Sequence, residues 1–191
     1  MPISRLLVLA MLLLTAAYAS AQETLPVNFD DPEIQAWRAQ QQRAFAFPLP
    51  AQVPELNLPV LNFVRPPFSS VRFSAANAAL PIMSVPDGDR DSYAILNTFG
   101  SFQVTVFGSR RVQTRLDAAQ AGLLPRTEME VQTSRKDPEN PREAFVNFNR
   151  YGLPYTLMVE CDEETRAICS SAQSLRELTG NLGLIYVPKS S

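Results

Sequence analysis

The chain has 191 residues, with 17 basic and 19 acidic side chains and no histidine. That length suits one domain with a core of its own and an accessory arm. The near balance of charge argues against a nucleic-acid partner, because such a partner requires a strongly basic patch. The lack of histidine excludes Ser-His-Asp and Cys-His nucleophile systems, together with imidazole ligands for metals.

Residues 1–21 have the composition of a secretory signal peptide. Arg5 supplies a positive charge, residues 6–14 are apolar, and small residues follow. Ala17-Tyr18-Ala19 and Ala19-Ser20-Ala21 both fit the cleavage rule, and we prefer cleavage after Ala21. The apolar run is shorter than the roughly 20 residues that span a bilayer. We therefore predict a periplasmic or secreted protein with no transmembrane anchor after cleavage.

The chain has two cysteines, Cys161 and Cys169. In an oxidising compartment, a nearby pair of this kind predicts a disulfide. A redox dithiol is the alternative, but it normally has the closer C-x-x-C spacing. With both cysteines oxidised and no histidine, a zinc site would have only carboxylate ligands. We therefore expect a structural disulfide, and neither a metal site nor a cofactor.

Two β-hairpins are predicted from alternating apolar and polar residues. One joins residues 143–150 to residues 155–161 through the breaker Tyr151-Gly152-Leu153-Pro154. The other joins residues 93–98 to residues 102–107 through Phe99-Gly100-Ser101. In both, an aromatic-Gly turn leads into an alternating strand. A duplication would explain this likeness, and so would chance in a β-rich chain.

The N-terminal region predicts a helix followed by an extended arm. Asp31-Pro32-Glu33 is typical of a helix start, and the helix should run to about Ala44. Residues 47–86 are rich in proline, which excludes a regular central sheet. Large apolar residues between the prolines favour an arm laid across the domain, with edge strands near 59–64 and 70–74.

The remaining segments complete an α+β prediction. Residues 116–124 suggest a short helix, 128–134 a strand, 170–182 a helix with a leucine stripe, and 184–187 a last strand. We predict an antiparallel meander of about five strands, with a C-terminal helix packed on one face and an N-terminal helix plus proline-rich extended arm. The predicted divisions are 1–21, 22–86 and 87–191.

Candidate partner-binding residues lie in two places. Trp37 on the N-terminal helix could anchor a partner, because exposed tryptophan is enriched at interfaces. Asn147, Asn149, Arg150 and Tyr151 give the second hairpin a polar and aromatic set suited to contact with a peptide or protein. The alternative for Trp37 is a helix that lies on the domain or on its membrane-side approach. The alternative for the hairpin residues is an ordinary solvated sheet face.

Arg110, Arg111 and Arg115 form a small basic cluster, a candidate site for an anion or an acidic envelope polymer. A solvated strand end is the alternative. Asp87, Asp89 and Asp91 have the spacing that opens a calcium loop. Ser92 and Thr98 stand where that loop needs glycine and glutamate, so we predict a polar turn.

No phosphate loop or nucleophile elbow is present in the sequence, and we name no catalytic residue. Carboxylates are the remaining catalytic option, with most of them near the cysteine loop: Glu128, Glu130, Glu160, Asp162, Glu163 and Glu164. We expect a non-enzymatic binding or accessory factor of the bacterial envelope, with a protein or an envelope polymer as partner. The alternatives are a carboxylate-dependent hydrolase of an envelope polymer and an inhibitor or immunity-type protein.

Overall fold

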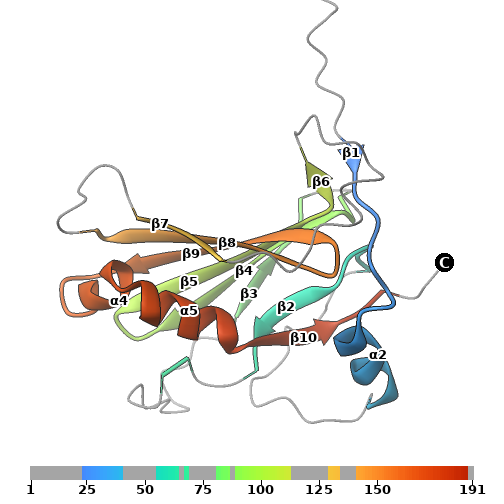
Figure 1. Ribbon diagram of the computed structural model, residues 1–191. Helices are drawn as coiled ribbons and strands as arrows, with labels where there is room; N and C mark the ends of the chain where they lie inside the picture. Colours follow the sequence, from blue (N-terminus) through green and yellow to red (C-terminus); the bar gives the residue numbers. More distant parts are fainter. Residues whose placement is uncertain are drawn as a thin grey trace, which may run out of the picture.

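The structure is a computed structural model that describes residues 23–40, 55–64, 67–68, 81–86, 89–112, 129–133 and 141–188. The central element is a six-stranded antiparallel sheet with the order β3-β4-β5-β9-β8-β7 (Figure 1). Its strands are β3 (Ile82–Ser84), β4 (Ser92–Phe99), β5 (Phe102–Ser109), β7 (Glu130–Thr133), β8 (Glu143–Arg150) and β9 (Leu153–Cys161). The predicted α+β class is confirmed.

The sheet consists of two three-stranded meanders, β3-β4-β5 and β7-β8-β9, which meet where β5 pairs with β9. In each meander the first strand in the sequence lies at an edge of the sheet and the last lies at its centre. This arrangement places the two predicted hairpins side by side, with their turns at opposite ends of the sheet. Tyr151 and Gly152 both have positive φ, at 56° and 77°, as a two-residue hairpin turn of type I′ requires.

Alternation along the strands gives the sheet one buried face, which we call the covered face. In β9 the side chains alternate between buried and partly exposed along the whole strand, because successive residues point to opposite faces. The registers between strands place the buried residues of β4, β5, β8 and β9 on the same side. These residues are Tyr93, Ile95, Asn97, Phe99, Phe102, Val104, Val106, Ala144, Val146, Phe148, Leu153, Tyr155, Leu157, Val159 and Cys161.

A second layer packs on the covered face (Figure 1). It contains the antiparallel pair β2 (Val60–Phe63) and β10 (Leu182–Tyr186), with α4 (Arg166–Ser170) and α5 (Ala172–Gly180). Leu175 and Leu178 are buried, as the predicted leucine stripe requires. The helical region is divided at Ser171, which is extended and accepts a hydrogen bond from the Ser174 backbone N–H. We expected a start at Ser170 or Ser174.

The N-terminal region also joins the core. Asp31 caps α2 (Pro32–Ala39) by accepting a hydrogen bond from the Glu33 backbone N–H at 2.9 Å. The strand β1 (Glu23–Thr24) pairs with β6 (Arg111–Val112). Residues on both sides of the predicted division at 86/87 contribute to one hydrophobic core. The predicted signal peptide, the strand at 70–74 and the helix at 116–124 lie outside the described residues.

Two buried tyrosines connect the proline-rich segment to the sheet. The Tyr93 hydroxyl accepts a hydrogen bond from the Leu61 backbone N–H at 2.8 Å, and the Tyr155 hydroxyl donates to the Pro59 carbonyl at 3.0 Å. Gly108 lies between Tyr93 and Tyr155 in the register. A Cβ atom at Gly108 would lie 2.4 Å from Tyr93 Cε1 and 3.0 Å from Tyr155 Cε1. A glycine is therefore required for both rings to reach β2.

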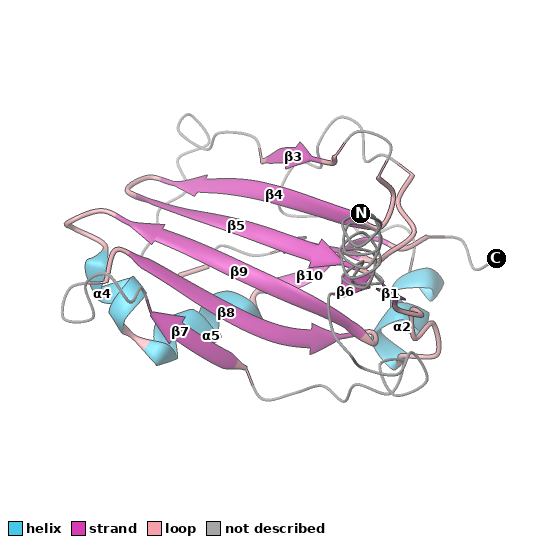
Figure 2. Cartoon of the chain, turned by 90° about the horizontal axis from the view of Figure 1, so that it is seen from above, coloured by secondary structure: helices cyan, strands magenta, loops and turns pink. Residues whose placement is uncertain are grey.

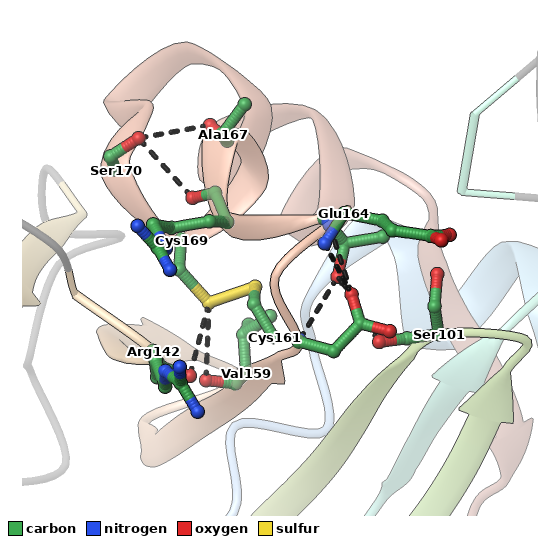
Figure 3. Close-up of a disulfide and its surroundings, with 11 residues drawn as sticks. Ser101, Arg142, Val159, Cys161, Glu164, Ala167, Cys169 and Ser170 are labelled. Carbon is green, nitrogen blue, oxygen red and sulfur yellow. Dashed lines mark hydrogen bonds between the residues drawn. A yellow bond between two sulfur atoms is a disulfide. The ribbon is translucent and has the colours of Figure 1, made fainter.

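The predicted disulfide between Cys161 and Cys169 is present (Figure 3). It joins the end of β9 to α4, with a sequence separation of 8 residues. Cys169 Sγ lies 3.5 Å from the Arg142 carbonyl oxygen and 3.6 Å from the Val159 carbonyl oxygen. In the part of the chain that the structure describes, no helix combines the length and the apolar character needed to cross a membrane.

We expect Gly108→Ala to lower the free energy of unfolding by about 1–3 kcal/mol, because the added methyl group would overlap the tyrosine rings. Urea unfolding measures this change. Gly180→Ala is the matched control, since a Cβ atom there meets nothing within 4 Å. That helical substitution should leave stability unchanged or raise it by up to about 1 kcal/mol. Equal stabilities of the wild type and Gly108→Ala would show that the rings have room to move.

We expect the double substitution Cys161→Ala, Cys169→Ala to lower the free energy of unfolding by about 2–3 kcal/mol, because the unfolded chain regains the freedom of the closed loop. Urea unfolding with and without dithiothreitol separates the bond from the change of side chains. The reductant should destabilise the wild type and leave the variant unchanged. A fully reduced wild type as stable as the oxidised protein would contradict a stabilising role for the bond.

Candidate functional site

The face of the sheet opposite the second layer is the candidate site, and we call it the open face. Figure 2 views the sheet from this side, with α4, α5 and β10 behind it. Successive residues of a strand point to opposite faces, so the residues between those of the covered face point to the open face. In β5 the open-face residue Thr105 is also buried. A solvated sheet face is normally polar. The open face also has apolar residues, and several of them pair with one another across neighbouring strands.

An apolar row crosses the open face at right angles to the strands. Ile82 pairs with Leu96, Leu96 with Thr105, Thr105 with Met158, and Met158 with Phe145. Side chains that pair directly across strands are close neighbours, so these residues form a continuous line from β3 to β8. Ile82 at the edge is 64% exposed, while Thr105 at the centre is 9% exposed. We call these five residues the apolar row, although its central member, Thr105, is polar and buried.

Phe107 extends the apolar surface into the next row, where it pairs with Ala94 on one side and Thr156 on the other. Phe107 is 37% exposed, and with Ile82 it is one of the exposed large apolar side chains of the described residues. Beyond Phe107 this row is polar, since it continues through Thr156 and Asn147 to Glu130 on β7. Thr156 Oγ1 donates a hydrogen bond to Asn147 Oδ1 at 2.8 Å. The apolar surface therefore has a polar limit on this side.

An acidic border, Glu143 and Glu160, limits the apolar row on its other side. These two residues pair directly across β8 and β9, and both side chains are exposed. Gln103 pairs with Glu160 from β5 and continues the same row. Like charges placed directly opposite each other repel. In the described residues, neither carboxylate has an ion pair, whereas Arg142 and Arg166 both pair with Glu163.

The structure divides the predicted partner-binding group on β8. Asn147 and Asn149 lie on the open face, as their register partners Thr156 and Pro154 do. Arg150 instead donates hydrogen bonds to the Leu182 and Thr179 carbonyls, at 3.2 and 3.5 Å. Tyr151 is 2% exposed, and its ring packs edge-on against Tyr155. These four residues therefore do not form one surface, and their binding role stays a prediction.

Trp37 is half-buried and connects α2 to β10. Its Nε1–H donates a hydrogen bond to the Leu184 carbonyl at 3.1 Å. The neighbouring Arg38 donates to the Pro188 carbonyl at 3.2 Å. Two side chains of α2 therefore bind backbone carbonyls in β10 and just after it. This contact gives Trp37 a structural role, which is to hold α2 against β10. A partner-anchoring role for it stays a prediction.

The basic cluster and the aspartate turn pair with each other. Arg110 Nη1 lies 3.3 Å from Asp91 Oδ1, and Arg110 Nε also donates a hydrogen bond to the Leu25 carbonyl. Arg111 Nη2 lies 3.0 Å from Asp89 Oδ1. Arg115 is outside the described residues. In the ranges that the structure describes, no group of carboxylates is arranged to hold a metal ion. Anion binding by Arg110, Arg111 and Arg115 stays a prediction.

The shifted titratable groups are suited to structural roles. Burial raises the pKa of the phenols of Tyr93, Tyr151 and Tyr155, because the charged phenolate is disfavoured away from water. Desolvation alone would raise the pKa of the Asp89 carboxyl, but hydrogen bonds from Ser92 and Asp91 and the charge of Arg111 lower it overall. Hydrogen bonds from Thr165 and Glu164 likewise outweigh desolvation and lower the pKa of Asp162. A general acid needs the opposite shift.

The apolar part of the open face was not predicted from the sequence. A signal for it was present, because Leu96, Phe145 and Met158 stand at solvent positions of strands whose alternation was recognised. The strand periodicity alone did not reveal that these residues share one row. Their alignment depends on the register between β3, β4, β5, β9 and β8.

Comparisons of this chain with models of protein families, with curated proteins and with solved structures find no match. Function is therefore inferred from the geometry of the open face.

We expect Phe107→Asn to change the free energy of unfolding by less than about 1 kcal/mol, as is usual for surface substitutions. Val106→Asn is the matched comparison, because Val106 is the preceding residue of β5 and is fully buried on the covered face. It should cost about 3–5 kcal/mol, since it leaves a cavity and buries an amide. Urea unfolding of both variants tests this contrast. A comparable loss from Phe107→Asn would make the open face part of the core.

Proposed function

We propose that this protein is an exported, non-enzymatic binding factor of the bacterial envelope that holds a partner on the open face of its sheet. The observation that carries this proposal is the apolar row on the open face of five adjacent strands. Its four apolar members are exposed or partly exposed, and Thr105 at the centre is buried. Contiguous exposed apolar surface with a polar rim is typical of interaction sites. Single apolar residues on a surface would need no such explanation.

The apolar row is not required to build the core. The covered face already packs against β2, β10 and α5, with buried side chains from each of them. The row lies on the opposite side of the same strands, and each Å² of apolar surface there gains roughly 25 cal/mol when a partner removes it from water. Binding therefore provides a reason for side chains that the fold leaves partly exposed.

Two features support export. Residues 1–21 have the composition of a secretory signal. The disulfide between Cys161 and Cys169 is of the kind that persists in oxidising compartments. A periplasmic or secreted location follows from this proposal, and so does a partner present in the envelope or outside the cell.

The hydrolase alternative has weaker support. Glu143 and Glu160 form the only opposed carboxylate pair of the open face among the described residues, and both are exposed. Catalytic carboxylates of glycosidases instead flank a bound substrate, with one pKa raised by burial. An inhibitor or immunity-type protein would use the open face as a binding surface, so it is a special case of the proposed function.

The proposal is tested by site-specific photo-crosslinking in the envelope of cells that export the protein. A photoreactive phenylalanine analogue replaces Phe107 on the open face or, as a control, Gln173, an exposed residue of α5. We expect a discrete adduct from position 107 that is absent at position 173. The proposal is wrong if position 107 gives no adduct, or if both positions give the same set of adducts.

A further inference from the structure

From the open face we infer that the partner is a cationic amphipathic helix, which lies along the apolar row with basic residues beside Glu143 and Glu160. This inference rests on the proposed function and adds the chemical class of the partner. It is carried by two independent observations, which are the direction of the apolar row and the unpaired charge of the acidic border.

The direction of the row indicates a partner that binds through side chains. The apolar row crosses from β3 to β8, and neighbouring strands lie about 4.8 Å apart, so its length is about 19 Å. A helix of about 13 residues has the same length, and its turns recur every 5.4 Å or so. Apolar residues at helical spacing would then meet successive strands. An added β-strand would pair at β3 or β7, because those strands form the edges of the sheet.

The negative charge of the acidic border indicates that the partner has basic residues beside it. Glu143 and Glu160 oppose each other with no cation of the described chain between them, whereas Arg110, Arg111, Arg142 and Arg166 all pair with other carboxylates. A lysine or arginine placed beside the border would remove the like-charge repulsion of the free protein. The row on the other side of the helix would meet Thr156 and Asn147, which are neutral. The carboxylate of that row, Glu130, lies beyond Asn147 on β7, past the β8 end of the apolar row.

A second copy of the chain does not supply this charge. If the two-fold axis follows the apolar row, Glu160 of one copy faces Thr156 of the other, and Glu143 faces Asn147. If the axis instead follows the strands, both acidic borders lie at the same end of the interface. Both dimers bury carboxylates without a counter-ion, which is costly. An anionic membrane surface is disfavoured for the same reason.

The test uses labelled peptides of about 18 residues, long enough to cover the row as a helix, and the full mature protein. The first has leucine and lysine at amphipathic helical spacing, the second has the same composition in scrambled order, and the third has glutamate in place of lysine. Fluorescence anisotropy gives their dissociation constants. We expect the first peptide to bind at least about tenfold more tightly than the others, with a loss in high salt.

Variants locate the binding. Glu143→Gln with Glu160→Gln should weaken the lysine peptide about tenfold, since two charge contacts are lost. Glu164→Gln with Glu177→Gln makes the same change of net charge at exposed positions off the open face, and it should change affinity less than about twofold. Phe107→Asn should weaken binding at least about tenfold through the lost apolar contact.

Each other outcome overturns the inference in a recognisable way. If lysine and glutamate peptides bind equally and Phe107→Asn weakens both, the cationic class is wrong and the open face remains the binding surface. If no peptide binds but position 107 still forms an adduct in cells, the helical partner is wrong and the proposed function stands. Without binding or adducts, both fail. A dimer that Phe107→Asn dissociates would make a second copy the occupant.

Discussion

The fold depends on the contact between two tyrosine hydroxyls and the backbone of the proline-rich segment. The described part of this segment contributes β2, which pairs with β10 in a sheet separate from the six-stranded one, so its attachment to the larger sheet needs other hydrogen bonds. Tyr93 binds the Leu61 N–H and Tyr155 binds the Pro59 carbonyl, in the buried space under Gly108. Each hydrogen bond satisfies a backbone group that would be costly to bury unpaired. The second layer is thereby fixed to one face of the sheet.

Attachment on one side makes the two faces of the sheet different. The covered face has its core completed by β2, β10 and α5, and the disulfide holds α4 at the end of β9. No helix of the described chain packs over the open face, and the short pair β1 and β6 stands above it only at one end (Figure 1). The apolar row therefore lies on the side of the sheet that the second layer does not cover. This asymmetry is the physical basis for the binding role that we propose.

Charged residues divide in the same way between fold and surface. Arg110 and Arg111 pair with Asp91 and Asp89, where the chain passes from β5 to β6. Those pairs explain why an arginine cluster and an aspartate turn occur in one small domain. Glu143 and Glu160 have no such partner in the described residues, and they lie beside the apolar row. Charges that the fold does not use are the ones available to select a partner.

The sequence by itself determined the local features: the alternation of β4, β5, β8 and β9, the aromatic-Gly turns, the disulfide and the leucine stripe of α5. These depend on neighbouring residues, since a strand alternates with period two and a short cysteine loop closes easily. Tertiary structure decided which strands meet. Four features depend on segments that lie far apart in the chain. They are the pairing of β5 with β9, the apolar row, the burial of Tyr151 and the hydrogen bond from Trp37 to Leu184. Periodicity within a strand carries no information about its neighbour or register, and both are fixed only when the layers pack.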